Sequence, residues 1–338
     1  MAITISVLDQ SPIYPGETAA EALAHTVLLA QKSEQLGFRR FWVSEHHDSE
    51  QLAGSSPEVL ISYLLAKTEK IRIGSGGVML QHYSPFKVAE NFNVLASLAP
   101  GRVDLGIGRA PGGLPRSTQA LQRGNTDAAS LTDKIVELDE YVHNRLSQDH
   151  PLHGLKAAPL PEHPPELYVL GASKGSAEIA ASLGLPYVFS LFINGDEAET
   201  LEAIQSYRSA FNTEHGTRPQ AIIALAIAVA DTEEEAAGLA LPQKLVKIHL
   251  DSGKTLTLGT LEQAEEFGRQ ANEKYSIEEQ EPFITKGTKE TVRAKLEALH
   301  QASGVDEFIV TSNIAPFEKR IRSFELLSEA LDGAVVSK

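Results

Sequence analysis

Cysteine is absent from the 338 residues, which excludes disulfides, thiolate nucleophiles and thiolate metal ligands. Long apolar runs are also missing, since the longest, AIIALAIAVA at 221–230, has about half the length that a membrane-spanning helix needs. Basic residues are few: 30 Lys and Arg face 45 Asp and Glu, for a formal net charge of −15. No basic cluster occurs, so neither nucleic acid nor an anionic membrane is expected as a partner. The opening residues, MAITISVLDQ, contain no secretion signal, and we expect a soluble, cytoplasmic protein.

Short apolar runs alternate with longer amphipathic runs along the chain. Eight of the short runs predict strands: ITISVLD, FRRFWVS, IRIGSGGVML, RVDLGIG, ELYVLGAS, PYVFSLF, QAIIALAIAVA and EFIVTSN. Nearly all are continuously apolar, which is typical of parallel strands covered by helices. Eight such units predict a (β/α)8 TIM barrel with long loops at its C-terminal face.

Helix signals fall between these strands. A capping box at Thr18 and Glu21 opens a helix that stops at Gly37, and Ser-Pro pairs at 56–57 and 84–85 open two more. A doubly wound sheet is the competing architecture. It would need a G-x-G-x-x-G string after the first strand, whereas the nearest string, GIGRAPG, follows the fourth. We therefore expect one barrel domain over 1–338, with an irregular insertion at 241–286 as a candidate mobile lid.

The stretch FWVSEHHDSE ends the second predicted strand. Polar residues follow most strands, so Glu45, His46, His47 and Asp48 alone would mean little. In a barrel, however, catalytic groups come from the C-terminal ends of several strands. Asp9 and Gln10, the Gly76–His82 segment and Arg109 occupy the corresponding positions of strands one, three and four. All of these residues are expected at one mouth. Because neighbouring residues of an extended chain point to opposite faces, His46 and His47 cannot easily share a metal ion, and no metal is expected.

Two glycine-containing strand ends indicate a bound ligand. Gly171 ends a strand, and Ser173 and Ser176 then lead into a helix whose N-terminus favours a phosphate. The alternative is an ordinary N-cap serine, but Arg109 on the neighbouring strand could supply positive charge. Gly76 and Gly77 mark either close approach of a flat ligand or a bend at the barrel rim.

These motifs together resemble the bacterial luciferase-like flavin monooxygenases. The likeness rests on RFWVSEHH, on RIGSGGVML followed by GIGR, on LGASKGSAEIAASLGLP, and on the ending GVDEFIVTSNIAPFEKRIRSFELLSEAL. It is strongest to a branch of luciferase-like oxidoreductases that opens SVLDQSP. The resemblance implies a (β/α)8 barrel that binds reduced FMN, or in some branches a deazaflavin, at its mouth.

Several site assignments follow from the resemblance. His46 matches the luciferase histidine needed for oxygen chemistry, with Glu45 and His47 flanking it, and we expect His46 to handle protons near working pH. The groups that match those holding the flavin phosphate are Arg109, Ser173 and Ser176, beside Gly171. Gly76-Gly77 falls where luciferase has a non-prolyl cis peptide, and we expect one here. Luciferase has alanines at these glycines, a cysteine at Gly108 and a tryptophan at Leu191, so the substrate pocket should differ and light emission is not implied.

The implied reaction uses reduced FMN and O2 to oxygenate a small organic substrate such as an aldehyde or ketone. The chain contains no reductase module, so a separate flavin reductase is expected as a partner, and a homodimer is expected from the resemblance. Two alternatives remain open. One is a deazaflavin-dependent hydride-transfer oxidoreductase on the same fold, and the other is a non-catalytic flavin-binding protein.

Overall fold

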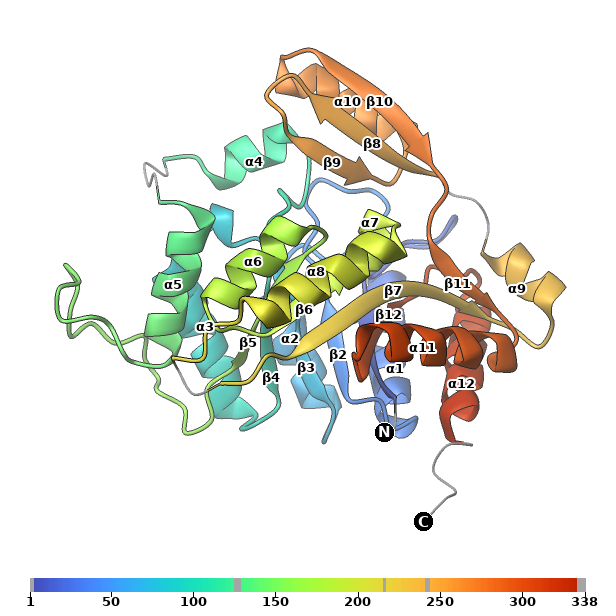
Figure 1. Ribbon diagram of the computed structural model, residues 1–338, viewed down its shortest axis with the longest axis horizontal. Helices are drawn as coiled ribbons and strands as arrows, with labels where there is room; N and C mark the ends of the chain where they lie inside the picture. The colour runs from blue at the N-terminus through green and yellow to red at the C-terminus, as the bar shows by residue number, and fades with distance from the viewer. Residues whose placement is uncertain (1–2, 125–128, 215–216, 241–243, 333–338) are drawn as a thin grey trace.

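The computed structural model describes residues 3–124, 129–214, 217–240 and 244–332, and its centre is a closed barrel of parallel strands (Figure 1). The barrel strands are β1 (Thr4–Asp9), β2 (Arg40–Val43), β3 (Arg72–Val78), β4 (Val103–Ile107), β5 (Glu166–Gly171), β6 (Tyr187–Ser190), β7 (Ala221–Val229) and β12 (Glu307–Thr311). Pairing runs in order from β1 to β6 and closes through β6–β7, β7–β12 and β12–β1. These are the eight strands that the sequence predicts, so the (β/α)8 fold is confirmed.

Helices between the strands cover the outside of the barrel. They are α1 (Ala19–Gln35), α2 (Pro57–Lys67), α3 (Pro85–Leu98), α5 (Leu131–Val142), α6 (Lys174–Ser182), α8 (Glu197–Ser209), α11 (Lys289–Ser303) and α12 (Phe317–Asp332). The predicted capping box is present, since Thr18 Oγ1 accepts from the Glu21 N–H at 3.2 Å and the Glu21 carboxylate accepts from the Thr18 N–H at 2.8 Å. Shorter helices lie in the loops: η1 (Leu80–His82), α4 (Pro115–Leu121), α7 (Leu191–Asn194) and α9 (Glu233–Leu239). Within the described ranges, no helix is long and apolar enough to cross a bilayer.

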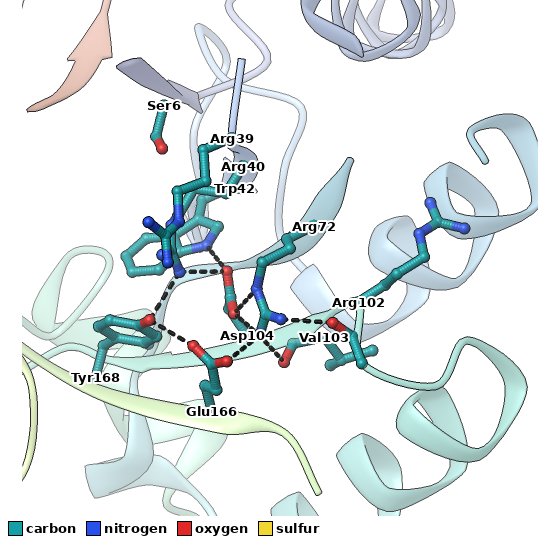
Figure 2. A network of polar contacts seen from close by, with 12 residues as sticks. Ser6, Arg39, Arg40, Trp42, Arg72, Arg102, Val103, Asp104, Glu166 and Tyr168 are labelled. Carbon is teal, nitrogen blue, oxygen red and sulfur yellow. Dashed lines mark hydrogen bonds and ion pairs between the residues drawn. The ribbon is translucent and has the colours of Figure 1, made fainter. Parts of the chain in front are cut away.

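The inside of the barrel is charged at the N-terminal end of the strands and apolar in the middle. Figure 2 shows the charged layer, in which Arg40 and Arg72 converge on Asp104 beside Tyr168. The Arg40 Nη1–Asp104 Oδ2 distance is 2.9 Å, and both side chains are fully buried. Above them lies an apolar layer made by Leu8, Trp42, Tyr168, Val188, Ile222, Ala224 and Ile309. Because side chains alternate along a strand, the next inward residues after this layer face the mouth, the C-terminal end of the barrel.

A small antiparallel sheet covers part of this end of the molecule. We call residues 245–280 the cap sheet: it contains β8 (Leu245–Leu250), β9 (Thr255–Leu258), α10 (Leu261–Ala271) and β10 (Tyr275–Gln280), with strand order β10-β8-β9. Figure 1 shows it at the top of the view, beside α4. Its core is Ile248, Leu250 and Phe267. After it, β11 (Ile284–Gly287) returns the chain to the barrel by pairing with β7.

The expectation of an irregular segment over 241–286 is wrong for the part of that range that the structure describes; residues 241–243 lie outside it. Val246, Ile248 and Leu250 are buried and the residues between them are partly exposed. This is the two-residue period of a strand with one covered face. The pattern is short and its partner strands are mostly polar, so it is weak in the sequence.

Candidate functional site

The mouth has a glycine-lined side formed by the ends of β3 and β4. The Gly76-Gly77 peptide is cis, as the resemblance to luciferase implies. A β-carbon on Gly77 would lie 2.6 Å from the Gly106 carbonyl oxygen, and one on Gly106 would lie 2.3 Å from the Ser75 carbonyl oxygen. Side chains are therefore excluded at both positions by the backbone of the adjacent strand. Glycine at these positions allows β3 and β4 to pack closely, and glycines within strands often mark a bulge or a place where a ligand approaches the backbone.

The Glu45-His46-His47 segment divides its side chains between two environments. His46 Nδ1 lies 3.0 Å from the hydroxyl of Ser44. His47 Nε2 lies 2.7 Å from Glu45 Oε1. Arg40 and Trp42 of β2 face the inside of the barrel, and the same alternation places Ser44 and His46 on the inner side. Glu45 and His47 are then on the outer side. The predicted separation of the two imidazoles is thus confirmed.

His46 is a neutral imidazole at working pH. Burial lowers its pKa to about 4, although the nearby Glu45 carboxylate acts in the opposite direction. The expectation that its pKa lies near working pH is wrong, because that expectation used the value of an exposed histidine and burial cannot be read from the sequence. In this structure the ring can accept a proton or a hydrogen bond, but it is not a cation.

Glu45 is the centre of a buried hydrogen-bond cluster. Its carboxylate accepts from Tyr83 OH at 2.7 Å and from His47 Nε2 at 2.7 Å, both on Oε1, and from the Met79 N–H at 3.0 Å on Oε2. The side chain of Glu45 is completely buried. Burial and the hydrogen bond to Glu45 raise the pKa of Tyr83, so the phenol remains protonated and donates. Glu45 thus connects the end of β2 to the chain that follows Gly77.

Tyr83 is a site residue that the sequence did not single out. It directly follows η1 and is the second residue of an HYSP string in which proline dominates the pattern, and only the fold brings it to Glu45. The sequence places His82 at a strand end and indicates no role for it. It is buried, and its Nε2 donates to the Pro111 carbonyl at 2.8 Å.

The predicted phosphate-binding residues lie at the ends of β4 and β5. Arg109 is exposed. Desolvation by the surrounding protein lowers the pKa of Lys254, and the nearby cation of Arg109 lowers it further. Lys254 belongs to the turn between β8 and β9, so the cap sheet brings a second cation to the Arg109 side of the mouth.

The two serines before and within α6 have different environments. Ser173 is the exposed N-cap of the helix, and its hydroxyl accepts from the Ser176 N–H. Ser176 is buried, and its hydroxyl lies 2.8 Å from Tyr187 OH. A β-carbon on Gly171 would lie 2.1 Å from Ser176 Oγ, so this glycine is what admits Ser176 to its position. Ser173 is therefore the better placed of the two to contact a ligand.

Asp9 is turned away from the mouth. Its carboxylate accepts from Arg320 Nη2 at 2.6 Å and from Thr26 Oγ1 at 2.6 Å, between β1, α1 and α12. The expectation that Asp9 lies at the mouth is wrong, because its position in β1 has the parity of the outward-facing Ile5 and Val7.

One inward residue at the mouth has an unpartnered polar atom. Glu307 and Ile309 of β12 face the inside of the barrel, so Thr311 does too, one step nearer the mouth. Among the described residues, its buried hydroxyl has no hydrogen-bond partner. Such a group costs on the order of 1–3 kcal/mol, and this orphan hydroxyl is what a polar ligand in the mouth would satisfy. Over the same described ranges, no group of three or more histidine or carboxylate side chains is arranged to hold a metal ion.

Comparison with known proteins gives matches over nearly the whole chain. Residues 1–307 match the family model described as luciferase-like monooxygenase. An N-acetyl-S-alkylcysteine monooxygenase of Bacillus subtilis (strain 168) is 42% identical over 332 residues, which cover 97% of this chain and 98% of the relative. Among solved structures, apo-MsnO8 is 33% identical with a TM-score of 0.79, and the match covers 98% of both chains.

More distant structures share the fold alone. The oxygenating constituent of 3,6-diketocamphane monooxygenase from Pseudomonas putida, solved in complex with FMN, has a TM-score of 0.72 at 18% identity and covers 99% of both chains. An F420-dependent secondary alcohol dehydrogenase, solved with an F420-acetone adduct, has a TM-score of 0.67 at 15% identity and covers 98% of this chain and 99% of its own.

Proposed function

Because this chain belongs to the luciferase-like monooxygenase family and is therefore an oxidoreductase, we propose that it is an FMN-dependent monooxygenase. It takes reduced FMN from a separate reductase and transfers one atom of O2 to a small organic substrate. The second oxygen atom leaves as water, and the flavin leaves oxidised. The observation that carries the proposal is the arrangement at the mouth, where His46 follows β2 and the glycine pair ends the adjacent β3.

The residues present fit a flavin. The glycines near the ends of β3 and β4, Gly77 and Gly106, would let a flavin ring approach the backbone closely, and the orphan hydroxyl of Thr311 would provide a polar contact within the barrel. Arg109, Ser173 and the first N–H groups of α6 would hold the phosphate. Because Ser176 is already paired with Tyr187, we assign it to support the Ser173 turn. When bound, reduced FMN supplies the two electrons that the reaction with O2 requires.

The protein groups around the ring position it and manage protons. The hydroxyl of Ser44 is hydrogen-bonded to Nδ1 of His46, so Nε2 is the ring nitrogen that would accept a proton or a hydrogen bond in the mouth. Because the pKa of His46 is low, its imidazole is neutral before it accepts a proton. Glu45 and His47 hold the backbone that carries His46. The cap sheet would exclude water as a lid over the Arg109 side of the mouth.

The substrates proposed for testing are suggested by a named relative and not by the mouth itself. The Bacillus subtilis relative is named for N-acetyl-S-alkylcysteines. Thioethers of this kind therefore belong beside aldehydes and ketones in a first substrate screen.

Two stripes of exposed apolar side chains support a homodimer. Val59 and Tyr63 lie one turn apart on α2, and Val94 and Leu98 lie one turn apart on α3; their exposed fractions are 69%, 53%, 44% and 71%. The two helices are in contact. We propose that a second copy of the chain covers this surface.

Anaerobic titration with FMN and with reduced FMN, followed by admission of air, tests the proposed function. We expect tight binding of reduced FMN and substrate-dependent O2 consumption. Replacing His46 by Asn should abolish product formation while FMN still binds, and the exposed His163→Asn serves as a matched control. Failure of both FMN forms to bind, with binding of a reduced deazaflavin, would instead identify a hydride-transfer enzyme. Binding with no turnover of any substrate, unaltered in His46→Asn, would point to a non-catalytic flavin-binding protein.

A further inference from the structure

The loop after β4 is held by three consecutive hydrogen bonds to its carbonyl oxygens. Gln81 Nε2 donates to Ala110 at 3.0 Å, and His82 Nε2 donates to Pro111 at 2.8 Å. The backbone N–H of His47 donates to Gly112 at 2.7 Å. Three donors from the ends of β2 and β3 thus bind the three residues that directly follow Arg109.

The imidazole of His82 is fixed in one tautomer. Its Nε2 must carry a hydrogen to donate to the Pro111 carbonyl, so Nδ1 is the acceptor, and it lies 3.0 Å from Gln122 Nε2. His82 is 4% exposed, and burial lowers the pKa of its imidazole. Both ring nitrogens are therefore committed to holding the segment from Pro111 to Gln122.

Close backbone packing on the same side strengthens this attachment. A β-carbon on Gly113 would lie 2.7 Å from the His47 carbonyl oxygen. Gly112 has a φ of +69°, which favours glycine, and its added β-carbon would lie 3.3 Å from the Glu45 carbonyl oxygen. The loop is pressed against the Glu45–His47 segment with no space for side chains.

The other side of the loop is attached to the cap sheet. Leu114 packs against the apolar core of the cap sheet, which contains Ile248 and Phe267. The Arg116 N–H donates to Gln270 Oε1 at 3.0 Å, from α4 to α10. The loop is therefore bound on one face by η1 and the His47 backbone and on the other by the cap sheet, and Arg109 lies near its start.

We propose that Gln81 and His82 are positioning residues that hold Arg109 at the flavin phosphate. Neither side chain needs to touch the ligand, since each acts through the carbonyls that follow Arg109. The inference rests on the proposed function, because it takes the phosphate of FMN as the partner of Arg109. It also assigns a role to the QHYSP segment after β3, which the flavin-binding assignments leave unused.

Comparing FMN with riboflavin isolates the effect on the phosphate. Riboflavin has the same ring and lacks the phosphate, so the ratio of its Kd to that of FMN reports the phosphate contacts alone. We expect the wild type to bind FMN about tenfold or more tightly than riboflavin, which is what one charge-assisted contact provides. Gln81→Met and His82→Leu should each lower this ratio several-fold with little change in riboflavin affinity. His82→Gln, which retains a donor, should recover part of it.

A double-mutant comparison tests whether the effect passes through Arg109. In an Arg109→Gln background, Gln81→Met and His82→Leu should change the ratio no further. The exposed Gln301→Met, on α11, is the matched control, and Gln81→Met remains informative if His82→Leu fails to fold.

Each other outcome overturns the inference in a recognisable way. If the wild type prefers FMN but Gln81→Met and a folded His82 variant retain that preference, the positioning role is refuted and the proposed function stands. If those variants lower the ratio equally with and without Arg109, the effect does not act through Arg109 and the inference is again refuted. If the wild type itself binds both flavins equally, the phosphate site fails and the inference falls with it.

Discussion

Glu45 is hydrogen-bonded to His47, two residues along the chain, with 2.7 Å between Oε1 and Nε2, and leaves the intervening His46 to a different partner. The carboxylate and the two imidazoles are adjacent in sequence but belong to two sites. Glu45 and His47 lie among Tyr83 and the chain after Gly77, whereas His46 belongs to the mouth. This division separates residues that hold the architecture from the one that would meet the flavin.

Removing donors from Glu45 should cost stability. Tyr83→Phe deletes one hydrogen bond to a buried carboxylate, and we expect a loss of about 1.5–3 kcal/mol in the free energy of unfolding. Glu45→Ala leaves Tyr83 OH, His47 Nε2 and the Met79 N–H without their acceptor, so its loss should be larger than that of Tyr83→Phe. Urea unfolding measures both. Tyr275→Phe, at a position in β10 that is 39% exposed, is the control, and an effect of equal size there would contradict this role of Glu45.

The protonation state of His46 should be visible in its NMR titration. With a pKa of about 4, the ring signals of His46 should stay constant from pH 8 down to pH 6. The signals of an exposed imidazole would change over this range, because its pKa is near 6.5. A transition of the His46 signals near pH 6.5 would show that the ring is not desolvated.

The same depressed pKa makes stability depend on pH. Between pH 6.5, where an ordinary imidazole titrates, and about pH 4, the unfolded chain binds a proton that the folded chain does not. Stability contributed at neutral pH is therefore lost as pH falls through this window. His82, whose pKa is lowered in the same direction, adds to the effect. Replacing His46 by Asn should reduce the slope of unfolding free energy against pH between 6.5 and 4.

The parts of the fold and the site that can be predicted from the sequence are those whose residues lie close together along the chain. The strands are continuous apolar runs, and the capping box at Thr18 and Glu21 spans four residues, so both are visible in one dimension. The opposite orientation of the His46 and His47 side chains depends only on neighbouring residues and can be predicted in the same way. Two partners of Glu45, Met79 and Tyr83, come from the segment after β3, 34 and 38 residues away, and no spacing rule connects them to Glu45.

Burial was the second limit of the sequence. The low pKa of His46 and the pairing of Asp9 with Arg320 both depend on which side of a strand faces the helices. The cap sheet is hard to predict for a related reason, because its strands are half polar and its covered face is marked mainly by Val246, Ile248 and Leu250.

The charged layer at the other end of the barrel should affect stability and not ligand binding. Asp104 accepts from Arg40 Nη1 at 2.9 Å, from Trp42 Nε1 at 2.8 Å and from Arg72 Nε at 2.9 Å (Figure 2). Asp104→Asn removes a negative charge that pairs with the buried guanidinium of Arg40, and breaking such a pair lowers the free energy of unfolding by about 3–5 kcal/mol. We expect a lower urea midpoint with an unchanged FMN Kd. Lys87→Gln, from an exposed pair with Glu90, should leave the midpoint unchanged.

The apolar stripes of α2 and α3 predict what a charge would do to the oligomer. Tyr63 and Leu98 are more than half exposed in the single chain, and covering them would remove apolar surface from water. A carboxylate placed there by Tyr63→Asp or Leu98→Asp would be desolvated at a dimer interface and left unpaired, so each variant should shift the mass measured by light scattering from dimer to monomer. Leu152→Asp, at a half-exposed position in the loop after α5, should retain the wild-type mass. A wild type that is monomeric at micromolar concentration would refute the homodimer. A Leu98→Asp variant that stays dimeric would show that the dimer interface lies elsewhere.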